Sequence, residues 1–176
     1  MTSLEQIVAL KEGRIDVGFG RIPHDDPMVE RVLMRNERLM VALPGTHALA
    51  VRTGPLRLAD LADIPLVVYP KAPRPSYADQ VLALFRDRDL RPPLVHEVKE
   101  LQTALGLVAA ESGISVVPAS VERLRRDNVI YVWLDEPDAI SPIIMSNRRD
   151  DPSPELALIL KLIKQMYRDE GIAFGR

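Results

Sequence analysis

The segment from Tyr69 to Tyr77, YPKAPRPSY, is the part of the chain best suited to hold a small anion. It places three prolines, two cations and a candidate helix start directly after an apolar run. Prolines restrict the backbone, so the N–H groups of Ser76 and Tyr77 would have fixed directions before a ligand arrives. A carboxylate would suit the positive end of the helix. A stiff connection whose charges are simply solvated fits the same residues about equally well.

The other polar residues form no recognisable catalytic or metal-binding pattern. Gly18-Phe19-Gly20 lacks the third glycine of a dinucleotide fingerprint and opens no helix, so we interpret it as a strand end that needs small residues. His24-Asp25-Asp26 are adjacent on a proline-flanked turn and cannot all point at one ion, which favours a solvated turn. His47 and His96 lack ligand-like spacing, and no serine sits on a nucleophile elbow. We therefore expect no catalytic residue, no metal and no cofactor.

Composition excludes several classes of protein. With 176 residues, 47% of them apolar and 27% charged, the chain can bury a proper core. Its 23 basic and 25 acidic residues give no basic footprint for nucleic acid, so any DNA contact would need another segment. The absence of cysteine excludes disulfides, thiolate catalysis and cysteine zinc sites. Without a membrane-length apolar stretch or a signal-peptide pattern, the sequence predicts a cytoplasmic protein.

The segment from Glu97 to Ser120 shows how the candidate site would be positioned. Apolar residues recur at helical spacing from Leu101 to Ala109, Gly113 stops the helix, and a short apolar run from Ile114 ends at a proline. This order of elements predicts a crossover of a parallel or mixed sheet. Such sheets bind small ligands beyond the carboxyl ends of their strands, where helices begin.

The remaining elements alternate, which favours an α/β fold. Ser3 and Gln6 have capping-box spacing for a helix that Gly13 ends and that turns Ile7 and Leu10 inward. Extended segments are predicted at residues 15–19, 29–34, 38–43, 66–69, 129–134 and 140–146. Helices are predicted at residues 56–61 and 76–85 and from Ser153 onward, the last with the core stripe Leu156, Ile159, Leu160, Ile163 and Tyr167.

Five segments carry a resemblance to a known family. They are GRIDVGFGR (13–21), RNERLMVALP (35–44), YPKAPRPSYADQV (69–81), EVKELQTALGLVAAESGISVVPAS (97–120) and LDEPDAISPI (134–143). Together they resemble the effector-binding domain of LysR-type transcriptional regulators. The PRPSY loop combined with RNERLMVA is similar to the muconate- and benzoate-responsive CatM/BenM type, whose members activate the breakdown of aromatic compounds. The likeness runs through nearly the whole chain.

The resemblance implies a periplasmic-binding-protein-like (type 2) pair of α/β subdomains joined by two crossover strands. Residues 1–36 and 140–176 would form subdomain I, and residues 37–139 would form subdomain II. The effector, cis,cis-muconate and possibly benzoate, would lie in the cleft between them. The family further implies a homo-oligomer, a dimer or tetramer, that uses no cofactor.

The resemblance also implies the residues that would contact the effector. Ser3 would offer its hydroxyl to one carboxylate. Thr2 is a further candidate contact, because capping the helix explains only one of these two neighbouring hydroxyls. Pro75, Ser76 and Tyr77 would receive the same carboxylate or its twin. Leu101 and Ile143 would line the apolar middle. Donors at the ends and apolar walls between them suit a flat diacid, because unpaired buried carboxylates are costly.

A second pocket is implied for an aromatic acid. Arg21, Arg35, Glu37 and Tyr167 match positions that bind such an acid in the benzoate-responsive type. Arginine can hold a carboxylate through two hydrogen bonds, and a tyrosine hydroxyl can add a third. The alternative is a buried arginine–glutamate pair with Tyr167 in the core.

The chain departs from the family at its start. LysR-type regulators begin with a winged helix-turn-helix and a linker helix, which this sequence lacks, so DNA binding is expected only of a longer protein. The strand, helix and strand that open the domain are also missing, which predicts an N-terminally truncated subdomain I with an exposed sheet edge. Two other classes stay open: a periplasmic solute receptor, which needs a signal peptide, and a small α/β enzyme, which needs a nucleophile or general base.

Overall fold

The computed structural model describes residues 1–175 and divides into two compact units. Unit 1 contains Met1–Asn36 and the C-terminal segment from Pro142, and unit 2 contains Glu37–Ser141. Two strands contribute residues to both units: β2 (Val29–Pro44) and β7 (Ile140–Arg148). Helices and strands alternate in each unit, which confirms the α/β class.

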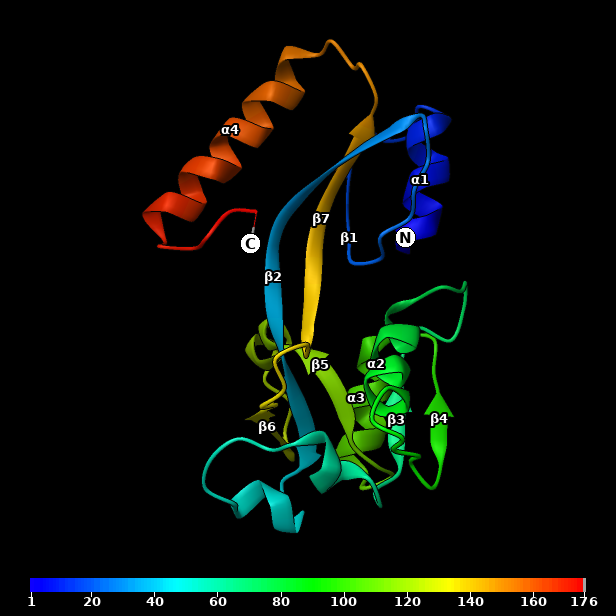
Figure 1. Cartoon of the computed structure of the whole chain (residues 1–176), viewed down its shortest axis with the longest axis vertical. Helices are drawn as coiled ribbons and strands as arrows, with labels where there is room; N and C mark the ends of the chain where they lie inside the picture. The colour runs from blue at the N-terminus through cyan, green and yellow to red at the C-terminus, as the bar shows by residue number, and fades with distance from the viewer. Residues whose placement is uncertain (176) are drawn as a thin grey trace. The chain divides into compact units, whose positions relative to one another are not determined.

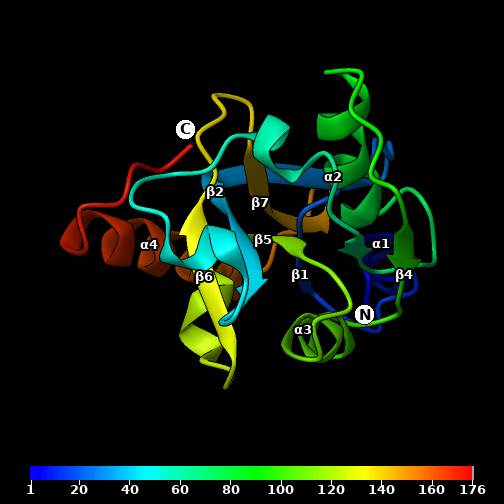
Figure 2. The same ribbon diagram turned by 90° about the horizontal axis from the view of Figure 1, so that it is seen from below.

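In unit 1 two helices flank a small antiparallel sheet (Figures 1 and 2). The helices are α1 (Ser3–Lys11) and α4 (Pro154–Asp169), and β1 (Val17–Gly20) joins β7 and β2 in the sheet. Each helix covers its own apolar cluster. The cluster at α1 contains Ile7, Leu10 and Val29, and the cluster at α4 contains Met34, Met145 and Tyr167. The predicted inward residues of the first helix are therefore confirmed.

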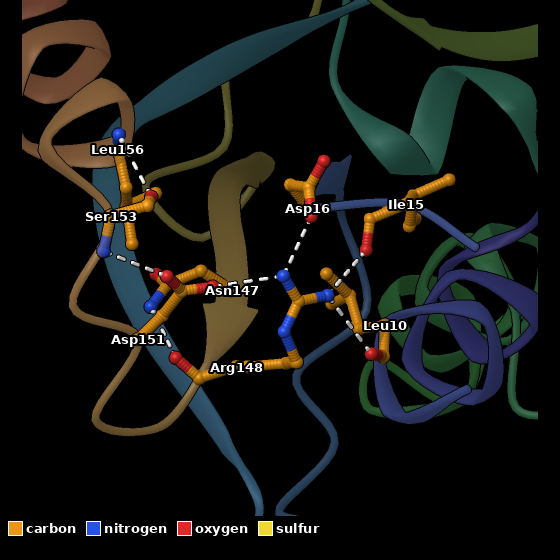
Figure 3. Close-up of polar contacts among 8 residues, drawn as sticks. All are labelled: Leu10, Ile15, Asp16, Asn147, Arg148, Asp151, Ser153 and Leu156. Carbon is orange, nitrogen blue, oxygen red and sulfur yellow. Dashed lines mark hydrogen bonds and ion pairs between the residues drawn. The ribbon is translucent and has the colours of Figure 1, made fainter. Parts of the chain in front are cut away.

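Arg148, near the end of β7, ties three segments of unit 1 together (Figure 3). Its Nη1 donates to the carbonyl oxygens of Leu10 (3.3 Å) and Ile15 (2.8 Å), which caps the C-terminal end of α1. Its Nη2 pairs with Asp16 at 2.6 Å and with Asp151 at 2.9 Å. One guanidinium thus fixes the end of α1 against the turn that leads into α4.

Unit 2 is a mixed sheet with a helix on each face. Its strands and α-helices are β3 (Leu66–Val68), α2 (Tyr77–Arg86), β4 (Val95–Glu97), α3 (Leu101–Ala109), β5 (Ser115–Pro118) and β6 (Val129–Trp133). Its 3-10 helices are Ala48–Val51, Leu58–Leu61 and Ala119–Leu124. β3 is parallel to β4, while β2 is antiparallel to β5 and β6. A parallel bridge between Leu66 and Ile114 links β3 to the start of β5, so the crossover predicted from Glu97 to Ser120 is present.

The buried half of β2 explains why the helices lie on opposite faces (Figure 2). Side chains alternate along a strand, so Leu39, Val41 and Leu43 join the cluster that contains α2. Met40 and Ala42 join the cluster that contains Leu105 and Val108 of α3. A strand covered on both faces is expected to be continuously apolar, as this one is.

Three details of the sequence predictions are wrong. Thr2, not Ser3, caps α1: its Oγ1 accepts from the Glu5 amide at 3.4 Å, and the Glu5 carboxylate accepts from the Thr2 amide at 2.7 Å. Residues 29–34 and 38–43 belong to one strand and not to two. Ile159 is 37% exposed and so lies outside the core stripe of α4.

None of the helices described between residues 1 and 175 is long and apolar enough to cross a membrane.

Candidate functional site

The carboxyl ends of β3 and β4 form the edge at which the predicted loop lies. Because the two strands are parallel, both end at the same edge of the sheet, and α2 and α3 begin after them. The Lys71 amide donates to the Val98 carbonyl at 2.8 Å, which holds the two connections side by side. The structure therefore brings the loop before Ser76 and the start of α3 at Leu101 to one edge of unit 2.

Ser76 caps α2 and is almost completely buried, with 3% of its surface exposed. Its Oγ donates to the Pro70 carbonyl at 2.9 Å, which closes the proline loop on itself. Its amide donates to Asp79 Oδ2 at 2.6 Å, so this N–H is already engaged. A ligand therefore does not find the Ser76 N–H free in this arrangement. The N-terminal end of α2 can still attract an anion through the positive end of the helix dipole.

The two cations of the loop differ in their surroundings. Arg74 Nη1 pairs with Asp79 Oδ1 at 2.5 Å, and its Nη2 lies 3.2 Å from Glu97 Oε2. Its Nε donates to the Lys71 carbonyl at 2.9 Å. Arg74 is thus built into the loop and is not simply solvated, whereas the side chain of Lys71 is exposed.

Tyr77 and Leu101 are the first residues of α2 and α3, and both pack near the carboxyl ends of β3 and β4. Tyr77 is 6% exposed, and its hydroxyl donates to the Val116 carbonyl of β5 at 3.3 Å. Its ring centroid lies 5.4 Å from that of Tyr69, the residue that follows β3. Tyr69 also packs against the cluster on the α3 side, as Leu101 does. Pro75, directly before Ser76, is exposed.

Two of the predicted residues of unit 1, Thr2 and Ser3, lie at the start of α1. Ser3 Oγ accepts from the amides of Arg21 at 3.2 Å and Ile22 at 3.4 Å. This contact depends on Gly20, because a Cβ there would lie 2.5 Å from Ser3 Oγ. Thr2 is engaged as the cap of the same helix. Ile143, on β7, is partly buried and packs against the cluster at α4.

The four residues of the second predicted pocket are split between the units. In unit 1 the Arg35 guanidinium lies 5.8 Å from the centre of the Tyr167 ring, and Tyr167 is 7% exposed. Arg35 Nε is buried and has no hydrogen-bond partner within the described residues. Arg21 is held through its amide by Ser3. In unit 2 the Glu37 carboxylate accepts from the Ser120 amide at 2.6 Å.

Several of the polar residues that the sequence analysis did not assign to a site have structural partners. Gly18 gives room to the side chain of Gln6, whose amide donates to the Phe19 carbonyl at 2.9 Å, so the interpretation of two small residues at a strand end is confirmed. Asp26 accepts from Lys11 Nζ at 2.9 Å, and this bond holds the pKa of Asp26 below its ordinary value. His47 Nδ1 accepts from the Leu49 amide at 3.1 Å. Over residues 1–175, no three side chains of the histidine, aspartate and glutamate types converge on a possible metal.

One residue and one contact that matter for the site are missing from the sequence predictions. Asp79, which holds both the Ser76 amide and Arg74, was not predicted, and neither was the approach of Ser3 to β1 that Gly20 permits. A signal for Asp79 was available, because Ser76 and Asp79 have the spacing of a capping box. Gly20 carried no signal for its role, since a close approach to a distant helix cannot be read from neighbouring residues.

The family comparison matches residues 1–168 to the LysR substrate binding domain. The probable cat1 operon transcriptional activator of Acinetobacter lwoffii is 48% identical to the chain over 169 residues, which are 96% of this chain and 55% of that protein. The HTH-type transcriptional regulator BenM of Acinetobacter baylyi is 44% identical over 172 residues, or 97% of this chain and 57% of that protein. The chain therefore spans little more than half the length of these curated relatives.

Solved structures agree with the family comparison. The BenM effector binding domain with its effector benzoate superposes with a TM-score of 0.91 and 44% identity, covering 98% of this chain and 78% of that chain. CbnR, a LysR family transcriptional regulator, superposes with a TM-score of 0.84 and 31% identity, covering 93% of this chain and 56% of that chain. The type 2 periplasmic-binding-protein-like α/β fold is confirmed.

Proposed function

The chain belongs to the LysR substrate-binding domain family, and we propose that it is the effector-binding part of a LysR-type transcriptional activator of aromatic-compound catabolism. Its effector would be cis,cis-muconate, with benzoate as a second candidate. The observation that carries the proposal is the 44% identity and TM-score of 0.91 to a domain solved with benzoate as its effector. The whole regulator would act in the cytoplasm as a homo-oligomer and would contact DNA through a winged helix-turn-helix outside this sequence.

The two sets of predicted contacts would receive the two ends of the diacid. The set in unit 2 offers the positive end of α2 behind a loop that is closed by Ser76 and Arg74. The set in unit 1 offers the hydroxyl of Ser3, which already accepts two amides and has its proton left to donate to a carboxylate. Leu101 and Ile143 would contact the apolar carbons of the acid.

Arg35 supports a separate site for an aromatic acid. Its buried Nε lacks an acceptor among the described residues, which costs free energy that a carboxylate would restore. Arg21 would add a second cation, and Tyr167 would supply its ring and its hydroxyl. We propose that benzoate binds here. Glu37, the fourth residue predicted for this pocket, accepts a hydrogen bond from the Ser120 amide in unit 2.

Binding is the proposed activity, and chemical turnover is not part of it. A thermal-shift titration of the chain with cis,cis-muconate, benzoate and the saturated diacid adipate tests the assignment, because a ligand of the native state raises the melting temperature. We expect a saturable rise with muconate, a smaller or separate rise with benzoate and little response to adipate. Flat responses to both unsaturated acids, or steady consumption of either acid, would overturn the proposal.

A serine substitution assigns the muconate response to the predicted contacts. Ser3→Ala removes the hydroxyl of the unit 1 set, and we expect it to weaken muconate binding about tenfold while benzoate binding is kept. The matched control is Ser153→Ala, because Ser153 Oγ also accepts a hydrogen bond from a backbone amide, that of Leu156, in the same unit. Equal losses in the two variants would mean that Ser3 acts only through stability.

A further inference from the structure

A depression of about 500 Å³ lies in unit 2, away from the edge that carries the Ser76 loop. Residues of the 3-10 helix Ala119–Leu124, of the turn that follows it and of strand β6 line it. The lining residues are Glu122, Arg123, Arg125, Arg126, Asp127, Val129, Ile130 and Tyr131. The family-derived predictions for the muconate and aromatic-acid sites use none of them.

Among the residues that the structure describes, the three arginines of this depression form no ion pair. Within residues 1–175, neither Glu122 nor Asp127 pairs with Arg123, Arg125 or Arg126, although all five line the same space. Elsewhere in the molecule arginines such as Arg88 and Arg148 each bind two carboxylates. Three neighbouring guanidinium groups without partners repel one another, and an anion among them would remove that repulsion.

Tyr131 adds an unsatisfied polar group to the same depression. Its hydroxyl oxygen is shielded from solvent and has no hydrogen-bond partner in the described part of the chain. Burial raises the pKa of this phenol, while the charge of Arg126 opposes the shift and that of Glu122 adds to it. The hydroxyl is therefore a protonated donor at neutral pH. A buried donor without an acceptor is costly, so a native structure that keeps one often binds something there.

The backbone of the turn is also unusual. Arg125 ends the 3-10 helix with φ +39°, and Asn128 follows with φ +59°, both in the left-handed region that residues other than glycine rarely adopt. The Asn128 side chain fixes the turn by donating to the Ala109 carbonyl of α3 at 2.7 Å. The arginines therefore project from a turn that is held in place, which lowers the entropy lost when they bind a ligand.

We propose that this depression binds a small oxyanion, a phosphate or carboxylate group, through the guanidinium groups of Arg123 and Arg126 and the hydroxyl of Tyr131. Arginine is suited to either group because its planar fork donates two parallel hydrogen bonds. The hydroxyl of Tyr131 supplies a third donor, and the anion supplies the acceptor that this hydroxyl lacks. Arg125 raises the local positive potential. The carboxylates of Glu122 and Asp127 repel an anion, so it would bind in the part of the depression that the arginines line.

The single tryptophan of the chain provides a direct readout. Trp133 lies two residues after Tyr131 on β6, so both side chains stand on one face of the strand. Inorganic phosphate and acetate are titrated separately into the chain while Trp133 fluorescence is recorded, with sodium chloride at equal ionic strength as the blank. We expect a saturable change with at least one of the two anions and none with chloride. No saturable change with either anion would overturn the proposal.

Variants distinguish anion binding at this depression from a general effect of the positive charge of the protein. Arg123→Gln and Arg126→Gln should each weaken the binding of the responding anion about tenfold, and Tyr131→Phe should weaken it several-fold. The control is Arg91→Gln, which removes one exposed positive charge from the same unit. An equal loss in the control would show non-specific screening, and full binding by Tyr131→Phe would refute the hydroxyl contact. The muconate response should be unchanged in all four variants, so the effector assignment is tested independently.

Discussion

At the scale of single residues, two glycines at the end of β1 make room for side chains of α1. A Cβ on Gly20 would lie 2.5 Å from Ser3 Oγ, which no packed structure allows. We expect Gly20→Ala to push Ser3 away from its two amides and to lower the free energy of unfolding by about 1–3 kcal/mol. Muconate binding should weaken at the same time, because the same hydroxyl is displaced. Urea denaturation and the thermal-shift titration measure the two effects.

Gly106 is the matched control for that substitution, because it lies inside α3 in ordinary helical surroundings. A Cβ there would lie 3.5 Å from Arg126 Nη2, which is a normal contact. Alanine favours a helix over glycine by roughly 0.5–1 kcal/mol, so Gly106→Ala should raise the denaturation midpoint and leave muconate binding unchanged. If Gly20→Ala were as harmless as Gly106→Ala, the close approach of Ser3 to β1 would be disproved.

The start of α1 shows what residue patterns cannot decide. Thr2 with Glu5 and Ser3 with Gln6 have the same spacing, so either pair fits a capping box. The structure uses Thr2 because Glu5 brings a negative charge to the positive end of the helix, and its pKa is lowered by the hydrogen bond from the Thr2 backbone. That choice leaves Ser3 to face β1, where the prediction from the family had placed a ligand contact.

At the scale of elements, the loop before α2 depends on one carboxylate. Asp79 accepts from the Ser76 amide and pairs with Arg74, so Asp79→Ala would release both the cap and the loop. We expect a loss of about 1 kcal/mol in the free energy of unfolding and weaker muconate binding. Equilibrium denaturation in urea, followed by circular dichroism, gives the first value, and the thermal-shift titration gives the second.

The control for Asp79 lies at the opposite end of the same helix. Asp87 is the C-terminal cap residue of α2, and its exposed carboxylate lies 3.6 Å from Arg86. Removing a negative charge from the C-terminal end of a helix is neutral or slightly stabilising. Asp87→Ala should therefore keep both stability and muconate binding, and a similar loss in both variants would argue against a special role for the Ser76 loop.

The continuity of strand β2 could not be predicted from the sequence. The sequence predicted two extended segments, 29–34 and 38–43, on either side of the polar residues Arg35, Asn36 and Glu37. In the structure the Glu37 carboxylate is satisfied by the amide of Ser120, which lies 83 positions further along the chain. A partner at that separation cannot be inferred from local periodicity. The helices and strands with regular apolar spacing, in contrast, were predicted close to their observed positions.

At the scale of the whole molecule, acid should destabilise both units. The pKa of Asp151 in unit 1 is lowered by the Ser153 amide, and that of Asp138 in unit 2 by the hydrogen bond from Arg88. A carboxyl whose folded pKa is lowered stabilises the fold above its unfolded pKa, about 3.9 for aspartate, and loses this effect as the pH falls through the folded value. Urea midpoints should therefore be level near neutral pH and fall below about pH 4.

A substitution tests whether the loss of stability at low pH comes from the protonation of Asp138 or from other effects of acid on the protein. Asp138→Asn removes one titrating carboxyl and should make the fall of the midpoint with pH shallower, although the starting stability is lower. Asp127→Asn serves as the control, because Asp127 is exposed and forms no ion pair within the described residues, so its curve should keep the original slope. Midpoints that stay constant down to about pH 2.5 would contradict the assignment of lowered aspartate pKa values.

The division into two units, each with its own apolar clusters, gives the effector proposal its most demanding test. Hydrogen exchange reports each amide separately, and local opening is suppressed where a ligand binds. If muconate contacts both predicted sets, it should slow exchange at Tyr77 in unit 2 and at Arg21 and Ile22, whose amides bond to Ser3 in unit 1. Benzoate should instead slow exchange around Arg35 and Tyr167. Protection by muconate in only one unit would contradict a diacid held at both ends, even if the melting temperature rises.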